Sequence, residues 1–293
     1  MASPLLTSDF MARLDRFDVM SRKILAGKMK GERRSKRRGQ SVEFADFRNY
    51  VIGDDLRFID WNIYARLDKL FLKLFLEEED LALSILVDTS ASMEFGTPNK
   101  LEYAKKLAAA LGYVGLVNYN RVTIGAISDR VVADTGGMRG RRRLPQMLKF
   151  LEDLKPSGRT DFAAACKRFV LTHRNKGVLV LISDFLMKGG FQDGLRYLAT
   201  GRYDFYGLQI LSPQEKNPAL QGDLRLVDVE DADEAEVTIT QPLLQKYNDN
   251  LTAYCLALKD HITRRGGVHL FTTSDVPFET VVLNYLRERG LLG

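Results

Sequence analysis

Two serines and an aspartate in the spacing D-x-S-x-S are the residues of this chain best suited to chemistry. Asp88, Ser90 and Ser92 come at the end of residues 81–87, a nearly continuous apolar run typical of a buried strand. A turn leaving such a strand can bring one carboxylate and two hydroxyl oxygens to one point. Oxygen ligands of this kind suit a hard cation, Mg²⁺ or Mn²⁺, better than zinc. Asp and Ser also satisfy backbone groups in ordinary turns, so these residues alone leave both interpretations open.

Two more polar residues occupy corresponding places farther along the chain. Asp184 follows the apolar run 178–183, and Thr160 lies in the loop before a helix-like segment that begins at residue 161. Taken singly, Thr160 suits a helix cap and Asp184 suits a turn. In an open parallel sheet, however, ligands bind beyond the carboxyl ends of the strands. The joint occurrence of these residues therefore favours one shared site.

The elements that would position these residues alternate between apolar strands and amphipathic helices from residue 81 onward. This alternation predicts an α/β fold with a doubly wound, mainly parallel sheet and helices on both faces. Before it, the spacing of apolar residues predicts a helix from Thr7 or Ser8 to Gly27, and the aromatic-rich residues 40–76 predict two or three short strands. We expect a small N-terminal helix plus β subdomain over residues 1–76 and the main domain over residues 77–293.

The composition indicates a folded globular protein. The chain has 293 residues, of which 45% are hydrophobic, and contains two cysteines. No apolar stretch approaches the roughly 18 residues that span a bilayer, and the N-terminus lacks the apolar core of a signal peptide. We therefore expect a cytoplasmic protein with no membrane span.

The formal charge of +5 is unevenly distributed, because residues 28–38 contain seven basic residues and one acidic residue. Arginines of this run and of a second basic cluster are candidate contacts for a partner or a phosphate: Arg33, Arg34, Arg37, Arg38, Arg141, Arg142 and Arg143. Such clusters leave nucleic-acid binding as an alternative function. Aromatic residues that could stack on bases do not interleave with them, which argues against it.

Two motifs of the chain resemble known families. The order D-x-S-x-S, a G-x-T-D loop and an Asp after a buried strand resembles the metal-ion-dependent adhesion site of von Willebrand factor A domains. The N-terminal part is similar to the signature of the DUF58 family, through Arg37-Arg38-Gly39, Glu43-Phe44, Arg48-Asn49-Tyr50, Gly53-Asp54-Asp55, Arg57, Ile59-Asp60-Trp61 and Ala65-Arg66.

The resemblance implies a role for each site residue. Ser90 and Ser92 would be direct ligands of Mg²⁺, with Mn²⁺ or Ca²⁺ as possible substitutes. Asp88 and Asp184 would bind the metal directly or through water, and Thr160 would be a state-dependent ligand. One coordination position would remain for a Glu or Asp of a partner protein. The family further implies a non-enzymatic adaptor working with a MoxR-type AAA+ ATPase in protein assembly or maturation.

An enzyme is the remaining alternative, since an Asp after a buried strand can accept a phosphoryl group in a Mg²⁺-dependent phosphohydrolase. The haloacid-dehalogenase pattern needs a second Asp two residues on, where this chain has Ser90. No histidine spacing suggests acid–base partners or zinc, and no phosphate-binding G-x-x-x-x-G-K-[ST] loop occurs. The acidic residues of 53–60 are expected to turn the chain and pair with Arg48, Arg57 and Arg66 rather than bind a second metal.

Overall fold

The computed structural model describes residues 5–21, 43–76, 81–127, 131–156, 161–173, 176–201, 203–228 and 233–293. The chain forms two compact units. The larger consists of Met1–Lys23 with Leu81–Gly293, and the smaller of Ile24–Asp80. Asp88 and Asp184 both belong to the larger unit.

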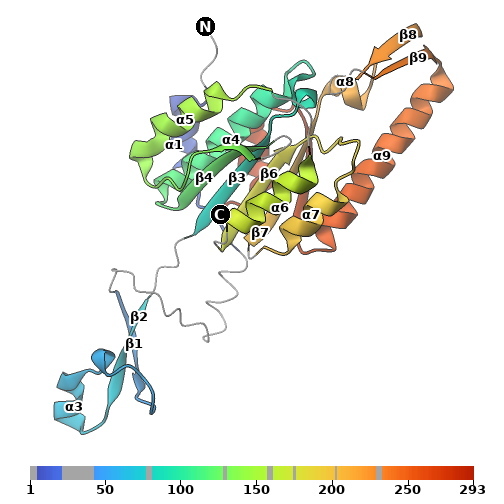
Figure 1. Cartoon of the computed structure of the whole chain (residues 1–293). Helices are drawn as coiled ribbons and strands as arrows, with labels where there is room; N and C mark the ends of the chain where they lie inside the picture. Colours follow the sequence, from blue (N-terminus) through green and yellow to red (C-terminus); the bar gives the residue numbers. More distant parts are fainter. Residues whose placement is uncertain are drawn as a thin grey trace. The chain divides into compact units, whose positions relative to one another are not determined.

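The larger unit is built on a six-stranded sheet with the strand order β10-β7-β6-β3-β4-β5 (Figure 1). Neighbouring strands are parallel, except that β5 runs antiparallel to β4. In this order the strands are β10 (Val268–Thr273), β7 (Tyr203–Leu211), β6 (Gly177–Ser183), β3 (Ala82–Asp88), β4 (Arg121–Ile127) and β5 (Val131–Asp134). This topology confirms the expected α/β fold with a doubly wound, mainly parallel sheet.

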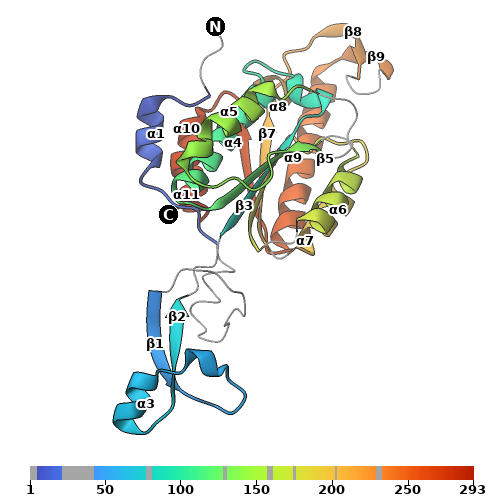
Figure 2. The ribbon, with the colours of Figure 1, turned by 60° about the vertical axis from the view of Figure 1, so that its left-hand side comes forward.

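Helices cover both faces of the sheet (Figures 1 and 2). One face carries α1 (Ser8–Leu14), α4 (Lys100–Val117), α5 (Leu144–Asp153) and a C-terminal segment made of α10 (Phe278–Thr280), the π-helix η4 (Val281–Tyr285) and α11 (Leu286–Glu288). The other face carries α6 (Phe162–Thr172), α7 (Gln192–Ala199) and α9 (Gln241–Thr263). The central strands are therefore buried on both sides, and all seven residues of β6 are buried.

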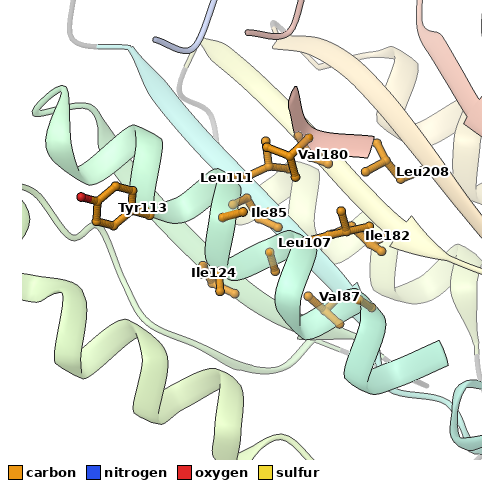
Figure 3. Close-up of a cluster of buried hydrophobic side chains, with 14 of the residues drawn as sticks. Ile85, Val87, Leu107, Leu111, Tyr113, Ile124, Val180, Ile182 and Leu208 are labelled. Carbon is orange, nitrogen blue, oxygen red and sulfur yellow. The ribbon is translucent and has the colours of Figure 1, made fainter. Parts of the chain in front are cut away.

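The largest part of the core lies between α4 and the sheet (Figure 3). Ile85 of β3 and Val180 of β6 pack there with Leu107 of α4, and none of the three exposes any surface. Two glycines let α4 approach its neighbours closely. A Cβ at Gly112 would lie 2.5 Å from Met147 Sδ of α5, and one at Gly115 would lie 2.6 Å from Val122 Cγ2 of β4. This packing fixes α4, and with it Lys100 at the start of the helix.

The first helix begins where the sequence predicts, because the Thr7 hydroxyl accepts a hydrogen bond from Phe10 N. The expected extension to Gly27 is wrong: α1 ends at Leu14. Residues 18–20 pair with the C-terminus instead, where Asp18 and Gly293 exchange two backbone hydrogen bonds of 3.0 Å. Phe10 and Leu14 are buried in the core of the larger unit, so this helix belongs there and not with the expected subdomain of residues 1–76.

The smaller unit contains an antiparallel pair, β1 (Glu43–Asn49) and β2 (Phe71–Leu76), with the short 3₁₀ helix η1 (Leu56–Phe58) and α3 (Trp61–Leu67) between them. The expectation of only strands here is wrong, because the Asp60 carboxylate accepts hydrogen bonds from Asn62 N and Ile63 N and starts a helix. Two of the expected ion pairs form, Asp54 with Arg48 and Asp55 with Arg57, whereas Asp60 pairs with Lys73.

The remaining elements are short. They are the 3₁₀ helices η2 (Ala91–Glu94) and η3 (Arg141–Arg143), the helix α8 (Pro213–Lys216), and the separate hairpin of β8 (Gly222–Val227) and β9 (Glu234–Ile239). Across the residues that the structure describes, no helix is both long enough and apolar enough to cross a membrane.

Candidate functional site

The sheet topology brings the two predicted aspartates to the same edge. β3 and β6 are adjacent and parallel, with Val87 opposite Ile182. Asp88 is the last residue of β3, and Asp184 directly follows β6. Both aspartate residues are 1% exposed, so they are held inside the protein at the carboxyl end of the sheet.

A chain of hydrogen bonds connects these aspartates through the two predicted serines. Ser90 N donates to Asp88 Oδ1 at 2.9 Å. The hydroxyl oxygens of Ser90 and Ser92 lie 3.0 Å apart, and Ser92 Oγ donates to Asp184 Oδ2 at 2.9 Å. Four of the five predicted metal ligands therefore form one continuous cluster. The fifth, Thr160, lies outside the described residues.

Ser183, the last residue of β6, is a member of this cluster that the sequence analysis missed. Its hydroxyl donates to Asp88 Oδ2 at 2.6 Å and accepts from Phe185 N at 2.8 Å. Burial and the nearby Asp184 raise the pKa of Asp88 to about 6, although the hydrogen bonds from Ser183 and Ser90 oppose this shift. Among the described residues, the negative charge of the buried Asp88 carboxylate is therefore not compensated by a nearby cationic side chain.

Lys100 is the second residue that the sequence analysis missed. Its side chain is completely buried at the start of α4, where Nζ donates to Asp184 Oδ2 at 2.7 Å and also contacts Glu215 Oε1. Burial opposes the charged form, but Asp184 and Glu215 together raise the pKa of Lys100 above its usual value. Cations are disfavoured at a helix N-terminus, so a lysine at the first position of α4 was a usable signal of nearby carboxylates.

Glu215 is held in place by its own helix. Ser212 and Glu215 form a capping box at α8, in which Ser212 Oγ accepts from Glu215 N and Glu215 Oε2 accepts from Ser212 N. The sequence pattern S-x-x-E is typical of this motif. One carboxylate oxygen therefore caps α8 while the other contacts Lys100.

A second polar layer lies behind Asp184. Gln209 of β7 donates from Nε2 to the Asp184 backbone carbonyl at 3.2 Å, and its Oε1 lies 3.2 Å from His269 Nε2. Burial, followed by the charges of Lys259 and Arg289, lowers the pKa of His269 to about 4. His269 is therefore neutral at physiological pH and orients Gln209.

The residues of the cluster fit a hard divalent cation. Within the described ranges no three His, Cys, Asp or Glu side chains gather in one place, so a metal here would depend on hydroxyl ligands. Two carboxylates and two serine hydroxyls are an oxygen-only set of the type that Mg²⁺ binds. The ammonium group of Lys100 contacts Asp184 and Glu215, and within the described part of the chain no ion pair compensates the carboxylate of Asp88, so the negative charge of this cluster also favours a cation.

Among the described residues, none of the arginines predicted to contact a partner or a phosphate belongs to this cluster. Arg33, Arg34, Arg37 and Arg38 lie outside the described residues. Arg141, Arg142 and Arg143 form η3 before α5. Arg141 lies 5.6 Å from the ring of Tyr113 and 3.9 Å from Asp15 Oδ2, which gives this arginine contacts to α4 and to the end of α1.

The chain is similar to several known proteins. An uncharacterized protein of Mycobacterium tuberculosis is 30% identical over 292 residues, and the match covers 96% of this chain and 90% of the relative. Among solved structures, the conserved hypothetical protein BatB from Bacteroides thetaiotaomicron matches with a TM-score of 0.43 and 13% identity, over 71% of this chain and 98% of that one. The VWA domain of SpRpn10 matches with a TM-score of 0.41 and 13% identity, over 70% and 94% of the two chains. The family model described as "Protein of unknown function DUF58" matches residues 46–254, and the chain belongs to that family.

Proposed function

We propose that this protein is a non-enzymatic interaction module that binds an acidic side chain of a partner protein through a divalent cation. Asp88, Ser90, Ser92 and Asp184 would hold the cation, and Thr160 would join them as a state-dependent ligand. The observation that carries the proposal is the continuous hydrogen-bonded cluster that these four described residues form at one end of the sheet. Mg²⁺ is the expected ion, with Mn²⁺ or Ca²⁺ as substitutes.

The charges of the cluster support a role in holding a ligand. Lys100 and Glu215 form an ion pair, so the two aspartates would just neutralise a bound divalent cation. Lys100 also donates to Asp184, which weakens that carboxylate as a metal ligand. When bound, the cation would supply a coordination position for an outside carboxylate.

The surroundings of Asp88 argue against the phosphohydrolase alternative. Both of its carboxylate oxygens accept hydrogen bonds within the protein, from Ser90 N and from Ser183 Oγ, and the residue is 1% exposed. A nucleophile that attacks a phosphate needs an accessible oxygen and a nearby general acid. The described histidine nearest in this network, His269, reaches the site only through Gln209.

The partner itself is proposed from the family resemblance alone. We expect a MoxR-type AAA+ ATPase, or a protein brought to it, with this chain as the adaptor. The proposal includes a cytoplasmic location, where ATP for such a partner is available. Nucleic-acid binding is the less favoured alternative, and steep salt dependence without chelator sensitivity would identify it.

Calorimetric titration with Mg²⁺ alone, after treatment with EDTA and dialysis, tests the metal site. The wild type is expected to bind one ion, and the double variant Asp88→Ala/Ser90→Ala is expected to bind none. Ser84→Ala, which removes a hydroxyl earlier in the same strand, is the matched control and should bind as the wild type does. A wild type that takes up no Mg²⁺, Mn²⁺ or Ca²⁺ would refute the proposed metal site.

Capture of partners from the native cell, with and without EDTA, tests the function. Proteins lost on chelation should also be lost with Asp88→Ala/Ser90→Ala and retained with Ser84→Ala. Identical captured proteins for the wild type and the double variant would contradict the proposal.

A further inference from the structure

The sheet ends in β10, an edge strand whose sequence lacks the charged and proline residues that usually prevent pairing. β10 is hydrogen-bonded to β7 on one side, and in the described part of the chain no strand lies on its other side. Its sequence, V-H-L-F-T-T, contains no Asp, Glu, Lys, Arg or Pro, and its register with β7 is unbroken. The opposite edge strand, β5, has only four residues and ends in Asp134. Charges, prolines, shortness or a covering helix or loop normally keep edge strands from pairing. β10 has no charged residue or proline and is partly covered, and Phe271 is its most exposed residue, at 38%.

A groove of about 780 Å³ lies across this edge. Successive residues of β10 line it, although side chains alternate between the two faces of a strand. Leu270 belongs to the core cluster that α4 and the C-terminal segment share. His269 and Phe271 therefore lie on the face of α9. The groove has α9 as one wall and the C-terminal segment as the other, with the backbone of β10 between them.

The walls of the groove are apolar with a basic margin. Leu256 of α9, Phe271 of β10 and Tyr285 of the C-terminal segment are 55%, 38% and 37% exposed. The charged residues that line the groove are Lys216, Lys259, Arg289 and Glu288. Lys259 and Arg289, one on each wall, both contribute to lowering the pKa of His269. The groove is therefore positively charged on balance.

We propose that the edge of β10 binds an extended, acidic segment of a partner protein, which adds to the sheet as a further strand. Backbone hydrogen bonds to β10 would supply affinity, and alternate apolar side chains of the segment would pack against the walls near Leu256 and Tyr285. Acidic side chains of the segment would lie near Lys216 and Lys259. A second copy of this chain is disfavoured, because two-fold pairing of β10 edges would bring the like charges of both copies together.

A phage-displayed library of random twelve-residue peptides, selected on the full chain and counter-selected on Phe271→Lys, tests this proposal. Enriched peptides are expected to alternate apolar and acidic residues. A fluorescein-labelled enriched peptide should bind at least tenfold more weakly to Phe271→Lys and to Lys259→Glu, and it should protect the amides of 268–273 from hydrogen exchange. Lys259→Glu changes only an exposed charge, so its loss of binding would not reflect misfolding.

Leu171→Lys is the matched control, since Leu171 is 60% exposed on α6 and far along the chain from the groove. It should bind the peptide as the wild type does, and EDTA should leave the affinity unchanged, which separates this site from the proposed metal site. Three outcomes would overturn the proposal: no peptide discriminates the wild type from Phe271→Lys, the enriched peptides are basic, or the wild type dimerises through β10 in sedimentation experiments.

Discussion

The two units of the chain bury their apolar residues to very different degrees. In the larger unit, the strands that flank the core expose almost nothing, and Ile85, Leu107 and Val180 are completely buried. In the described part of the smaller unit, Ile59 and Leu72 are buried, whereas Ile52 and Trp61 are 95% and 60% exposed. The side chains that the structure describes in the smaller unit therefore form little core.

The difference indicates that the two units are ordered by different forces. Burial of apolar surface stabilises the larger unit, and it is extensive enough to enclose the charged cluster around Asp184. A hairpin with one short helix buries too little to be stable by packing alone. Local polar contacts add to this burial in its described part, namely the Asp60 cap and the ion pairs of Arg48 and Lys73.

The largest effect is expected from Lys100→Met in the larger unit. Removing the ammonium leaves Asp184 and Glu215 facing each other without a counter-charge, which should cost about 4 kcal/mol of unfolding free energy. Urea denaturation followed by circular dichroism measures it. The matched control is Lys105→Met in the same helix, whose partner Glu102 is exposed and whose loss should cost about 1 kcal/mol or less. Equal losses of unfolding free energy in the two variants would mean that the buried ion pairs of Lys100 contribute no more to stability than the pair of Lys105 with the exposed Glu102.

A pH-dependent effect is expected from His269. Its pKa of about 4 lies below the value of about 6.5 for an unfolded chain, so the unfolded state binds a proton more readily. Protonation of His269 therefore leaves the unfolding free energy unchanged above about pH 7. It lowers the unfolding free energy as the pH falls from about 6.5 toward 4, by about 2.5 kcal/mol at pH 4.5. His269→Gln keeps a hydrogen-bonding side chain for Gln209 and should lack this loss. Urea denaturation of both proteins at pH 7.5 and 4.5 measures the difference, and parallel acid profiles would contradict the prediction.

In the smaller unit, Asp60→Ala should act locally. The variant loses the hydrogen bonds to Asn62 N and Ile63 N and the ion pair with Lys73, so α3 should fray. Amides of α3 are expected to exchange about fivefold faster, while the thermal unfolding of the larger unit stays unchanged. Asp68→Asn, at the other end of α3, is the control, because Asp68 has a left-handed backbone conformation (φ 50°) that asparagine tolerates and alanine does not. A fall in the unfolding temperature of the whole chain would show that the two units unfold together.

The smallest effect is expected from Trp61→Ser. Trp61 is the one tryptophan of the chain and is 60% exposed, so its loss should change the unfolding free energy by about 0.5 kcal/mol or less. The wild-type protein should show the red-shifted fluorescence of a tryptophan in water. A blue-shifted emission, or a loss of about 2 kcal/mol or more in the variant, would mean that the residue is covered.

The order of strands and helices in the larger unit could be predicted because buried parallel strands are almost continuously apolar, as residues 178–183 are. The meeting of Asp88 with Asp184 followed from the same pattern. Lys100 could not be placed, because its partners Asp184 and Glu215 lie far away in sequence and their meeting depends on the packing of α4. Ser183 could have been found from the same strand-end pattern, since it directly precedes Asp184 and contacts Asp88 on the neighbouring strand. The end of α1 at Leu14 was also unpredictable, since the C-terminus competes for the backbone of residues 18–20.

In the smaller unit, the helix-capping residue Asp60 predicts the local structure better than the aromatic residues do. Aspartate is a preferred residue at the start of a helix, and the hydrogen bonds that the Asp60 side chain accepts from backbone amides favour a helix over a strand at Trp61. Aromatic and β-branched residues favour strands only where a sheet surface exists to pack them.

Glu215 links the helices α8 and α9 to Lys100 beside the aspartate cluster. It caps α8 with one carboxylate oxygen and contacts Lys100 with the other, and its backbone carbonyl accepts a hydrogen bond from Tyr247 of α9. If α8 unwinds, Lys100 loses one of its two carboxylates, and its full charge falls on Asp184. The folding of a four-residue helix and the electrostatic potential at the Asp88–Asp184 edge therefore cannot change independently.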